Sequence, residues 1–161
     1  MKKYLRHLQS RKGSAMVFGI ILFLVVLMLF CSLYTYSKLK ITTAHIRNTA
    51  QQVLDTYTVS EGRKKVESFK NGTDYTVALE KDLFEDRMRD ALGIDDLTGY
   101  QNGRETFQIS DMSLHYSVQD EIKSSVQFRI REPLYFMGKQ VNALNETITV
   151  SSRYDPRYDP K

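Results

Sequence analysis

The stretch AMVFGIILFLVVLMLFCSL occupies residues 15–33 and contains no charged side chain. An α-helix rises about 1.5 Å per residue, so these residues would extend roughly 28 Å, close to the hydrocarbon thickness of a bilayer. The alternative is a buried core helix of a soluble protein, but such helices usually keep one polar face. The sequence therefore predicts a transmembrane helix, which we assign to residues 14–37.

The charges on either side of this segment predict its orientation. Lys38 and Lys40 directly follow the segment, whereas five basic residues precede it: Lys2, Lys3, Arg6, Arg11 and Lys12. By the positive-inside rule, the N-terminus lies in the cytoplasm. A cleaved secretory signal is the alternative, but its apolar core is shorter and ends at small residues, whereas Tyr34 and Tyr36 follow this one. We expect a single-pass protein of the cell membrane with an extracytoplasmic C-terminal domain.

Charge is divided unevenly along the chain. Residues 1–54 contain eight Lys and Arg and no Asp or Glu, whereas residues 55–161 contain 15 Lys and Arg and 19 Asp and Glu. The basic charge therefore flanks the membrane segment, and it gives no reason to expect nucleic-acid binding. The single cysteine, Cys31, excludes an internal disulfide and lies within the apolar segment.

Apolar residues continue beyond the membrane segment at helical spacing. No Pro or Gly interrupts residues 20–61, so the simplest prediction is one helix from residue 15 to about residue 59, with residues 38–59 as an amphipathic extension. The extension carries an apolar stripe that needs a partner, either the chain's own globular part or the helix of another copy. We call these residues the helix stripe: Leu39, Ile46, Ala50, Val53 and Tyr57.

A globular domain is predicted over residues 60–152. Glu61-Gly62 and Asn71-Gly72 punctuate the chain after the long helix. Apolar residues then recur at helical spacing over residues 75–92, which predicts a short second helix, and Gly93 is a candidate C′ residue.

Alternating apolar residues predict a small antiparallel sheet after a turn-rich stretch at residues 95–104. The alternation changes phase near Ser110-Asp111, which predicts a bulge. One face of this sheet would pack on the long helix, so the fold class is α+β, with a long helix, a short helix and a small antiparallel sheet. Strands are predicted near residues 107–118, 126–130 and 147–150, with an apolar linker at residues 134–137.

The end of the chain repeats the tetrapeptide Arg-Tyr-Asp-Pro at residues 153–156 and 157–160. Two prolines and little apolar content predict a disordered tail over residues 153–161.

No pattern in the sequence points to catalysis. Asp95-Asp96 and Asp120-Glu121 are adjacent acids in turn-rich segments, where solvated loop residues are more typical than an acid/base pair. Neither a nucleophile motif nor a Gly-rich phosphate loop nor metal-ligand spacing is present. We therefore expect no enzymatic activity, no cofactor or metal, and no small-molecule substrate.

The N-terminal region carries a family resemblance. Residues 1–13 form a short basic leader, and residues 11–17, Arg-Lys-Gly-Ser-Ala-Met-Val, lead into the apolar segment. This order of parts resembles type IV pilins and pseudopilins, and the junction looks most like the start of TadE-like minor pseudopilins of the tight-adherence system. The resemblance implies cleavage by a prepilin peptidase between Gly13 and Ser14. The family usually carries Glu at the fifth mature position, where this chain has Phe18.

Two functions from different classes remain open at this point. The resemblance implies a structural or initiating subunit of a Tad/type IV-like pilus or secretion filament, whose partners are the membrane, the assembly platform and other pilins or pseudopilins. The alternative is an uncleaved, single-pass anchored ectodomain that binds an envelope or extracellular partner. Only the first predicts a mature chain that begins at Ser14.

Overall fold

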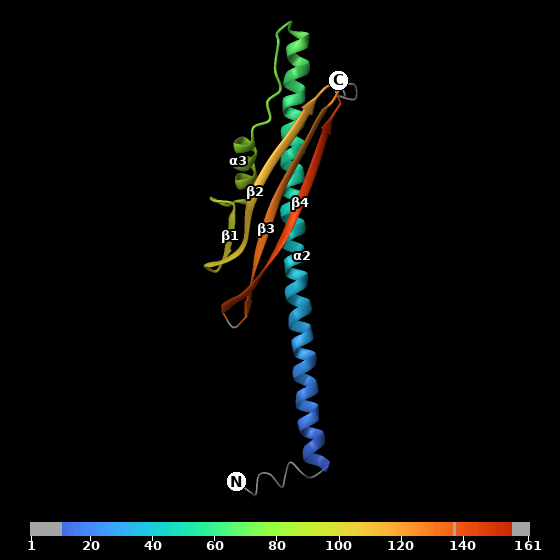
Figure 1. Cartoon of the computed structure of the whole chain (residues 1–161), viewed down its shortest axis with the longest axis vertical. Helices are drawn as coiled ribbons and strands as arrows, with labels where there is room; N and C mark the ends of the chain where they lie inside the picture. Colours follow the sequence, from blue (N-terminus) through green and yellow to red (C-terminus); the bar gives the residue numbers. More distant parts are fainter. Residues whose placement is uncertain (1–10, 137, 156–161) are drawn as a thin grey trace. The chain divides into compact units, whose positions relative to one another are not determined.

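The computed structural model describes the backbone of residues 11–136 and 138–155, and the side chains of residues 15–135 and 138–155. Residues 1–10 of the predicted leader and residues 156–161 of the predicted tail lie outside the described residues. The chain divides into two compact units, Met1–Thr42 and Thr43–Lys161. The elements, in chain order, are α2 (Arg11–Lys70), α3 (Lys81–Leu92), β1 (Thr98–Gln101), β2 (Arg104–Val118), β3 (Ile122–Phe136) and β4 (Lys139–Tyr154) (Figure 1).

Helix α2 is continuous, as predicted, but it ends at Lys70 rather than near residue 59. The expected break at Glu61-Gly62 is wrong because both residues are buried in the second unit while they remain helical. The helix ends at Asn71-Gly72, where Gly72 adopts a φ of 67° that favours glycine. There the backbone N–H of Thr73 donates to Ser68 O at 2.9 Å, which satisfies a carbonyl of the last turn.

Helix α3 is shorter than predicted because it begins at Lys81 rather than near Tyr75. Residues 73–80 are held outside a helix by α2: the Tyr75 hydroxyl donates to Glu61 Oε2 at 2.5 Å, and the Glu80 backbone N–H donates to Tyr57 Oη at 2.9 Å. The predicted C′ residue is confirmed, since Gly93 follows the helix with a φ of 66°.

The sheet has four antiparallel strands in the order β1-β2-β3-β4, which confirms the α+β class. The register of β2 against β3 shifts between Ser110 and Ser113, and Asp111 has a φ of 52°, so the predicted bulge is confirmed. Strand β1 was not predicted. It pairs with β2 through a two-residue turn, Asn102-Gly103, in which both φ values are positive, as in the hairpin turns that suit twisted strands.

The hairpin of β3 and β4 is longer than predicted at both ends. Pro133 pairs with Ala143 within the ladder, so the residues after it extend β3 instead of forming a linker. At the other end β4 continues to Tyr154, which pairs with Ile122 and is buried. The predicted disordered tail therefore begins too early, because its first two residues belong to the sheet.

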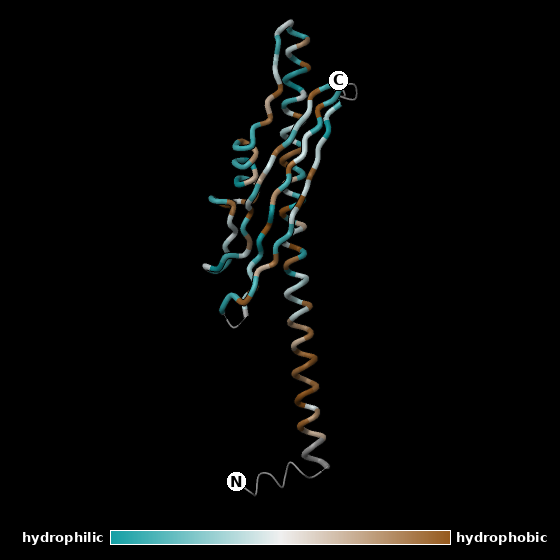
Figure 2. The backbone as a smooth tube through the Cα atoms, viewed as in Figure 1, coloured by the Kyte–Doolittle hydropathy of each residue, from teal (hydrophilic) through white to brown (hydrophobic). Residues whose placement is uncertain are grey.

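The core of the second unit lies between α2 and one face of the sheet. Residues of α2 that face the sheet are fully buried, and α3 adds Phe84 and Met88 to the same core. Alternate residues of β3 and β4 face the core, whereas those between them are mostly exposed and polar, so hydropathy alternates along these strands (Figure 2). The core-facing residues include Ile46, Ala50, Leu54, Tyr57, Val126, Phe128, Ile130, Ile148 and Val150.

Gly62 lies where α2 packs on β4, and a substitution at Gly62 tests this packing. A Cβ at Gly62 would overlap the ring of Tyr154, which is buried against it. We expect Gly62→Ala to destabilise the protein by about 1–3 kcal/mol through overpacking, although alanine is favoured over glycine in a helix by up to about 1 kcal/mol. Urea unfolding measures the change. In a Tyr154→Ala background the same substitution should be neutral or stabilising, and an equal cost in both backgrounds would contradict this packing.

Candidate functional site

The apolar part of α2 is exposed in the first unit. Every described side chain from residue 15 to residue 38 is exposed, although the segment is the most apolar of the chain (Figure 2). Two of its hydroxyl groups are satisfied within the helix, since Ser32 Oγ donates to Met28 O and Thr35 Oγ1 donates to Cys31 O, each at 2.9 Å. Internal satisfaction of polar groups is what a lipid environment requires. This long apolar helix is compatible with a single-pass membrane anchor.

The predicted cleavage site lies at the start of the same helix. The backbone of Gly13 and Ser14 is helical, and α2 begins two residues before Gly13. Phe18, at the position where the resembling family carries Glu, is 67% exposed. Within the described part of the first unit, the apolar surface is thus presented by aliphatic and aromatic side chains without a carboxylate.

The helix stripe is divided between the two units. Ile46, Ala50 and Tyr57 are buried against the sheet of their own unit, and Val53 packs against the same core. Leu39 belongs to the first unit and is partly exposed. Two partners were considered for the helix stripe, the chain's own globular part and the helix of another copy. Beyond Thr43 the stripe is covered by the chain's own sheet.

A polar cluster links α2 to the segment before α3. Glu61 is 4% exposed, and its two carboxylate oxygens accept bonds from Tyr75 Oη at 2.5 Å and from Lys64 Nζ at 2.7 Å. The hydrogen bond to Glu61 raises the pKa of Tyr75 and also that of Lys64. Both carboxylate oxygens of Glu61 are paired, so the cluster fixes the segment before α3 to the helix.

Glu132 is the second buried carboxyl group, and it is only half paired. It lies on the core face of β3 and is 1% exposed. Oε1 accepts a hydrogen bond from Thr43 Oγ1 at 2.9 Å, whereas Oε2 has no hydrogen-bond partner among the described residues. Burial raises the pKa of Glu132, the Thr43 hydrogen bond lowers it by less, and the charge of Glu146 on the neighbouring strand raises it further.

Glu132 makes stability depend on pH. Its pKa in the folded state lies above the value of about 4.3 for an exposed glutamate, so the folded chain binds more protons than the unfolded chain between the two values. Stability therefore falls as pH rises through this window. Glu132→Gln removes the titration and keeps an oxygen for Thr43, so we expect the variant to gain stability over the wild type as pH rises from about 4 to about 8.

Unfolding in urea at a series of pH values measures this difference. Glu67→Gln, at an exposed glutamate of α2, is the matched control for the loss of one carboxylate. A stability difference between Glu132→Gln and the wild type that does not change with pH would show that the buried carboxyl does not titrate as described.

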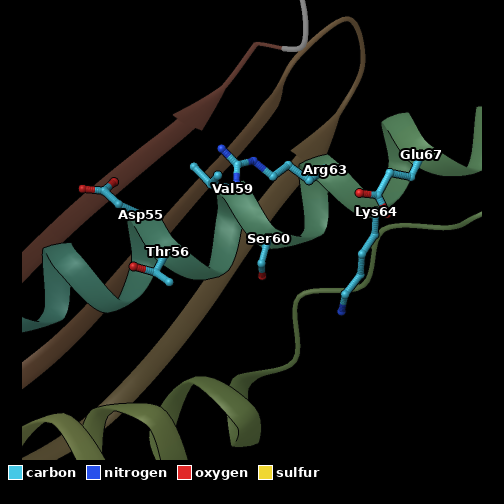
Figure 3. A pocket seen from close by; sticks show the side chains of 7 residues that line it. All are labelled: Asp55, Thr56, Val59, Ser60, Arg63, Lys64 and Glu67. Carbon is cyan, nitrogen blue, oxygen red and sulfur yellow. The ribbon is translucent and has the colours of Figure 1, made fainter. Parts of the chain in front are cut away.

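An open hollow of about 560 Å³ lies on the side of α2 shown in Figure 3. Its charged residues balance, with two acidic and two basic side chains, and they do not converge on one point (Figure 3). This is the arrangement of a solvated helix face. The lining residues are Asp55, Thr56, Val59, Ser60, Arg63, Lys64 and Glu67.

One side chain of each acidic pair makes a contact within the fold. Asp96 Oδ1 accepts a hydrogen bond from the Thr98 backbone N–H at 3.2 Å, which shapes the turn before β1. Glu121 forms ion pairs with Lys123 and Arg153. Over the residues that the structure describes, no three His, Cys, Asp or Glu side chains are grouped so that they could hold a metal ion.

The buried carboxyl groups were not singled out from the sequence, although a signal for each exists. Glu132 continues the parity of Phe128 and Ile130 in β3, which places it on the core face. Glu61 follows Tyr57 by four residues and so continues the helix stripe.

Comparison of the chain with protein-family models, curated proteins and solved structures found no match.

Proposed function

We propose that this chain is a TadE-like minor pseudopilin, a membrane-anchored structural or initiating subunit of a Tad/type IV-like pilus or secretion filament. The observation that carries the proposal is one uninterrupted helix, Arg11–Lys70, whose exposed apolar part follows the junction Gly13-Ser14 and whose later part packs on an antiparallel sheet. Such a subunit acts by assembling with other subunits through its exposed apolar helix.

The division of α2 limits which surface takes part in assembly. From Ile46 onward the apolar side of the helix is covered by the chain's own sheet, so a second helix cannot pack there without displacing the sheet. The exposed residues 15–38 are left to contact lipid before assembly and the helices of other subunits afterwards. Helix packing between subunits is therefore confined to the first unit, with Gly19 as a point of close approach.

The second candidate is an uncleaved anchored ectodomain that binds an envelope or extracellular partner. Phe18 favours this candidate, because the carboxylate that the resembling family uses at this position is missing. Both candidates share the anchor and differ in whether the leader is removed.

Mass spectrometry of the protein extracted from membranes tests the first candidate. We expect a chain that begins at Ser14, and Gly13→Leu should block cleavage and assembly while insertion into the membrane continues. Gly19→Leu is the matched control for cleavage alone, since Gly19 lies in the same helix with open space around it and outside the junction, and this variant should still begin at Ser14. A chain that retains Met1 would favour the second candidate.

The proposed orientation is tested with protease added to intact spheroplasts. With the N-terminus in the cytoplasm, the sheet domain lies outside, so residues 60–150 should be digested while the apolar segment stays protected in the membrane. Protection of the whole chain until the membrane is dissolved would reverse the orientation and contradict both candidates.

A further inference from the structure

A groove lies where the end of α2 meets the turn between β2 and β3. Its volume is about 210 Å³, below the roughly 300–1,000 Å³ of small-molecule sites, so it suits one side chain better than a free ligand. Its walls carry Val66 and Phe69 of α2, Ile122 of β3 and Tyr154 of β4. Phe69 is 72% exposed, which leaves a large aromatic ring uncovered at the groove.

Charged groups of both signs stand around these apolar walls. Lys65 Nζ lies 6.0 Å from the centroid of the Phe69 ring, on the helix side of the groove. On the opposite side, the turn between β2 and β3 contributes Asp120 and Glu121, and Asp120 is exposed. A segment with an aromatic ring between a cation and an anion matches this arrangement.

The chain already places one Arg-Tyr-Asp segment beside the groove. Tyr154 packs over Gly62, and Arg153 forms an ion pair through Nε with Glu121 Oε2. Tyr154 pairs with Ile122, the first residue of β3, and is the last residue of β4. In the sequence, Asp155 and Pro156 follow this residue of the groove wall, and proline has no backbone N–H with which to continue a strand ladder.

The next four residues, 157–160, repeat the same tetrapeptide. Tyr158 follows Tyr154 by four residues, so the two Cα atoms can be separated by at most about 14 Å. A segment tethered this closely has an effective concentration of about millimolar at the groove, which a weak contact needs in order to be occupied.

We infer that the groove binds the ring of Tyr158 from the same chain. The ring covers Phe69 as the ring of Tyr154 covers Gly62. Arg157 then stands on the side of Asp120, and the carboxylate of Asp159 on the side of Lys65.

A single tryptophan reports on this contact, because the chain contains none. In the full chain in detergent, Phe69→Trp places the reporter at the groove. We expect Tyr158→Ala, or a stop after Asp155, to shift the tryptophan emission to longer wavelength and to increase its quenching by acrylamide. Tyr158→Phe, which keeps the ring, should leave both unchanged.

Two controls keep the result specific to the groove. Tyr100→Trp, an exposed aromatic position on β1 that does not line the groove, should not respond to Tyr158→Ala. The peptide Arg-Tyr-Asp-Pro-Lys, added to the chain that stops after Asp155, should restore the emission at about millimolar concentration, and the same peptide with Ala for Tyr should not.

In the chain with its natural Phe69, acylation of Lys65 measured by mass spectrometry gives a second readout. Lys65 should react faster when Tyr158 is replaced by Ala. Equal emission and equal Lys65 reactivity with and without the ring of Tyr158 would overturn the inference. An emission shift that depends on protein concentration would also overturn it, because the tail would then come from a second copy.

Discussion

The burial of one side of α2 against the sheet is the contact on which the second unit depends. Ile46, Ala50 and Leu54 are fully buried there, and burying an aliphatic side chain of the size of Ile or Leu contributes about 1.5–3 kcal/mol. Because side chains alternate along a strand, this contact also sets which residues of β3 and β4 point inward. The same contact determines what α2 has left to offer a partner, since its covered side cannot serve two neighbours.

One helix thus meets two kinds of surroundings along its length. Residues 15–33 are apolar on nearly all sides, so no side of this segment is suited to water. Beyond Thr43 the apolar residues narrow to a stripe that matches one face of the sheet, and the remaining sides carry charge. The change from a segment that is apolar on nearly all sides to one with a single apolar stripe can be read from the sequence. It explains why the long apolar helix and the α+β fold could both be predicted.

Periodicity predicted the elements, but contacts between distant residues decided their ends. The sequence around Gly62 suggests a break, yet the helix continues because Tyr154, far away in the chain, covers that glycine. The extended segment before α3 depends likewise on bonds from Tyr75 and Glu80 to α2. Strand β1 was missed for a local reason, because Asn102-Gly103 is a strong hairpin signal that a turn-rich assignment concealed. The apolar segment needed no such contact, and the buried carboxyl groups were overlooked although their spacing placed them inward.

Polar contacts determine the position of α2 along the sheet, which apolar packing alone does not determine. Along α2, Thr43 bonds to Glu132 of β3, and Thr58 bonds to Ser124 of β3 at 2.6 Å, so polar contacts hold the helix to the sheet at two places. A helix that slid along the sheet by one turn would keep much of its apolar contact but leave these buried groups unpaired, at a cost of about 1–3 kcal/mol for each group. In this role only one carboxylate oxygen of Glu132 has a hydrogen-bond partner among the described residues. Its unpaired oxygen is therefore a cost of holding α2 in register, and the neutral form that burial favours reduces that cost.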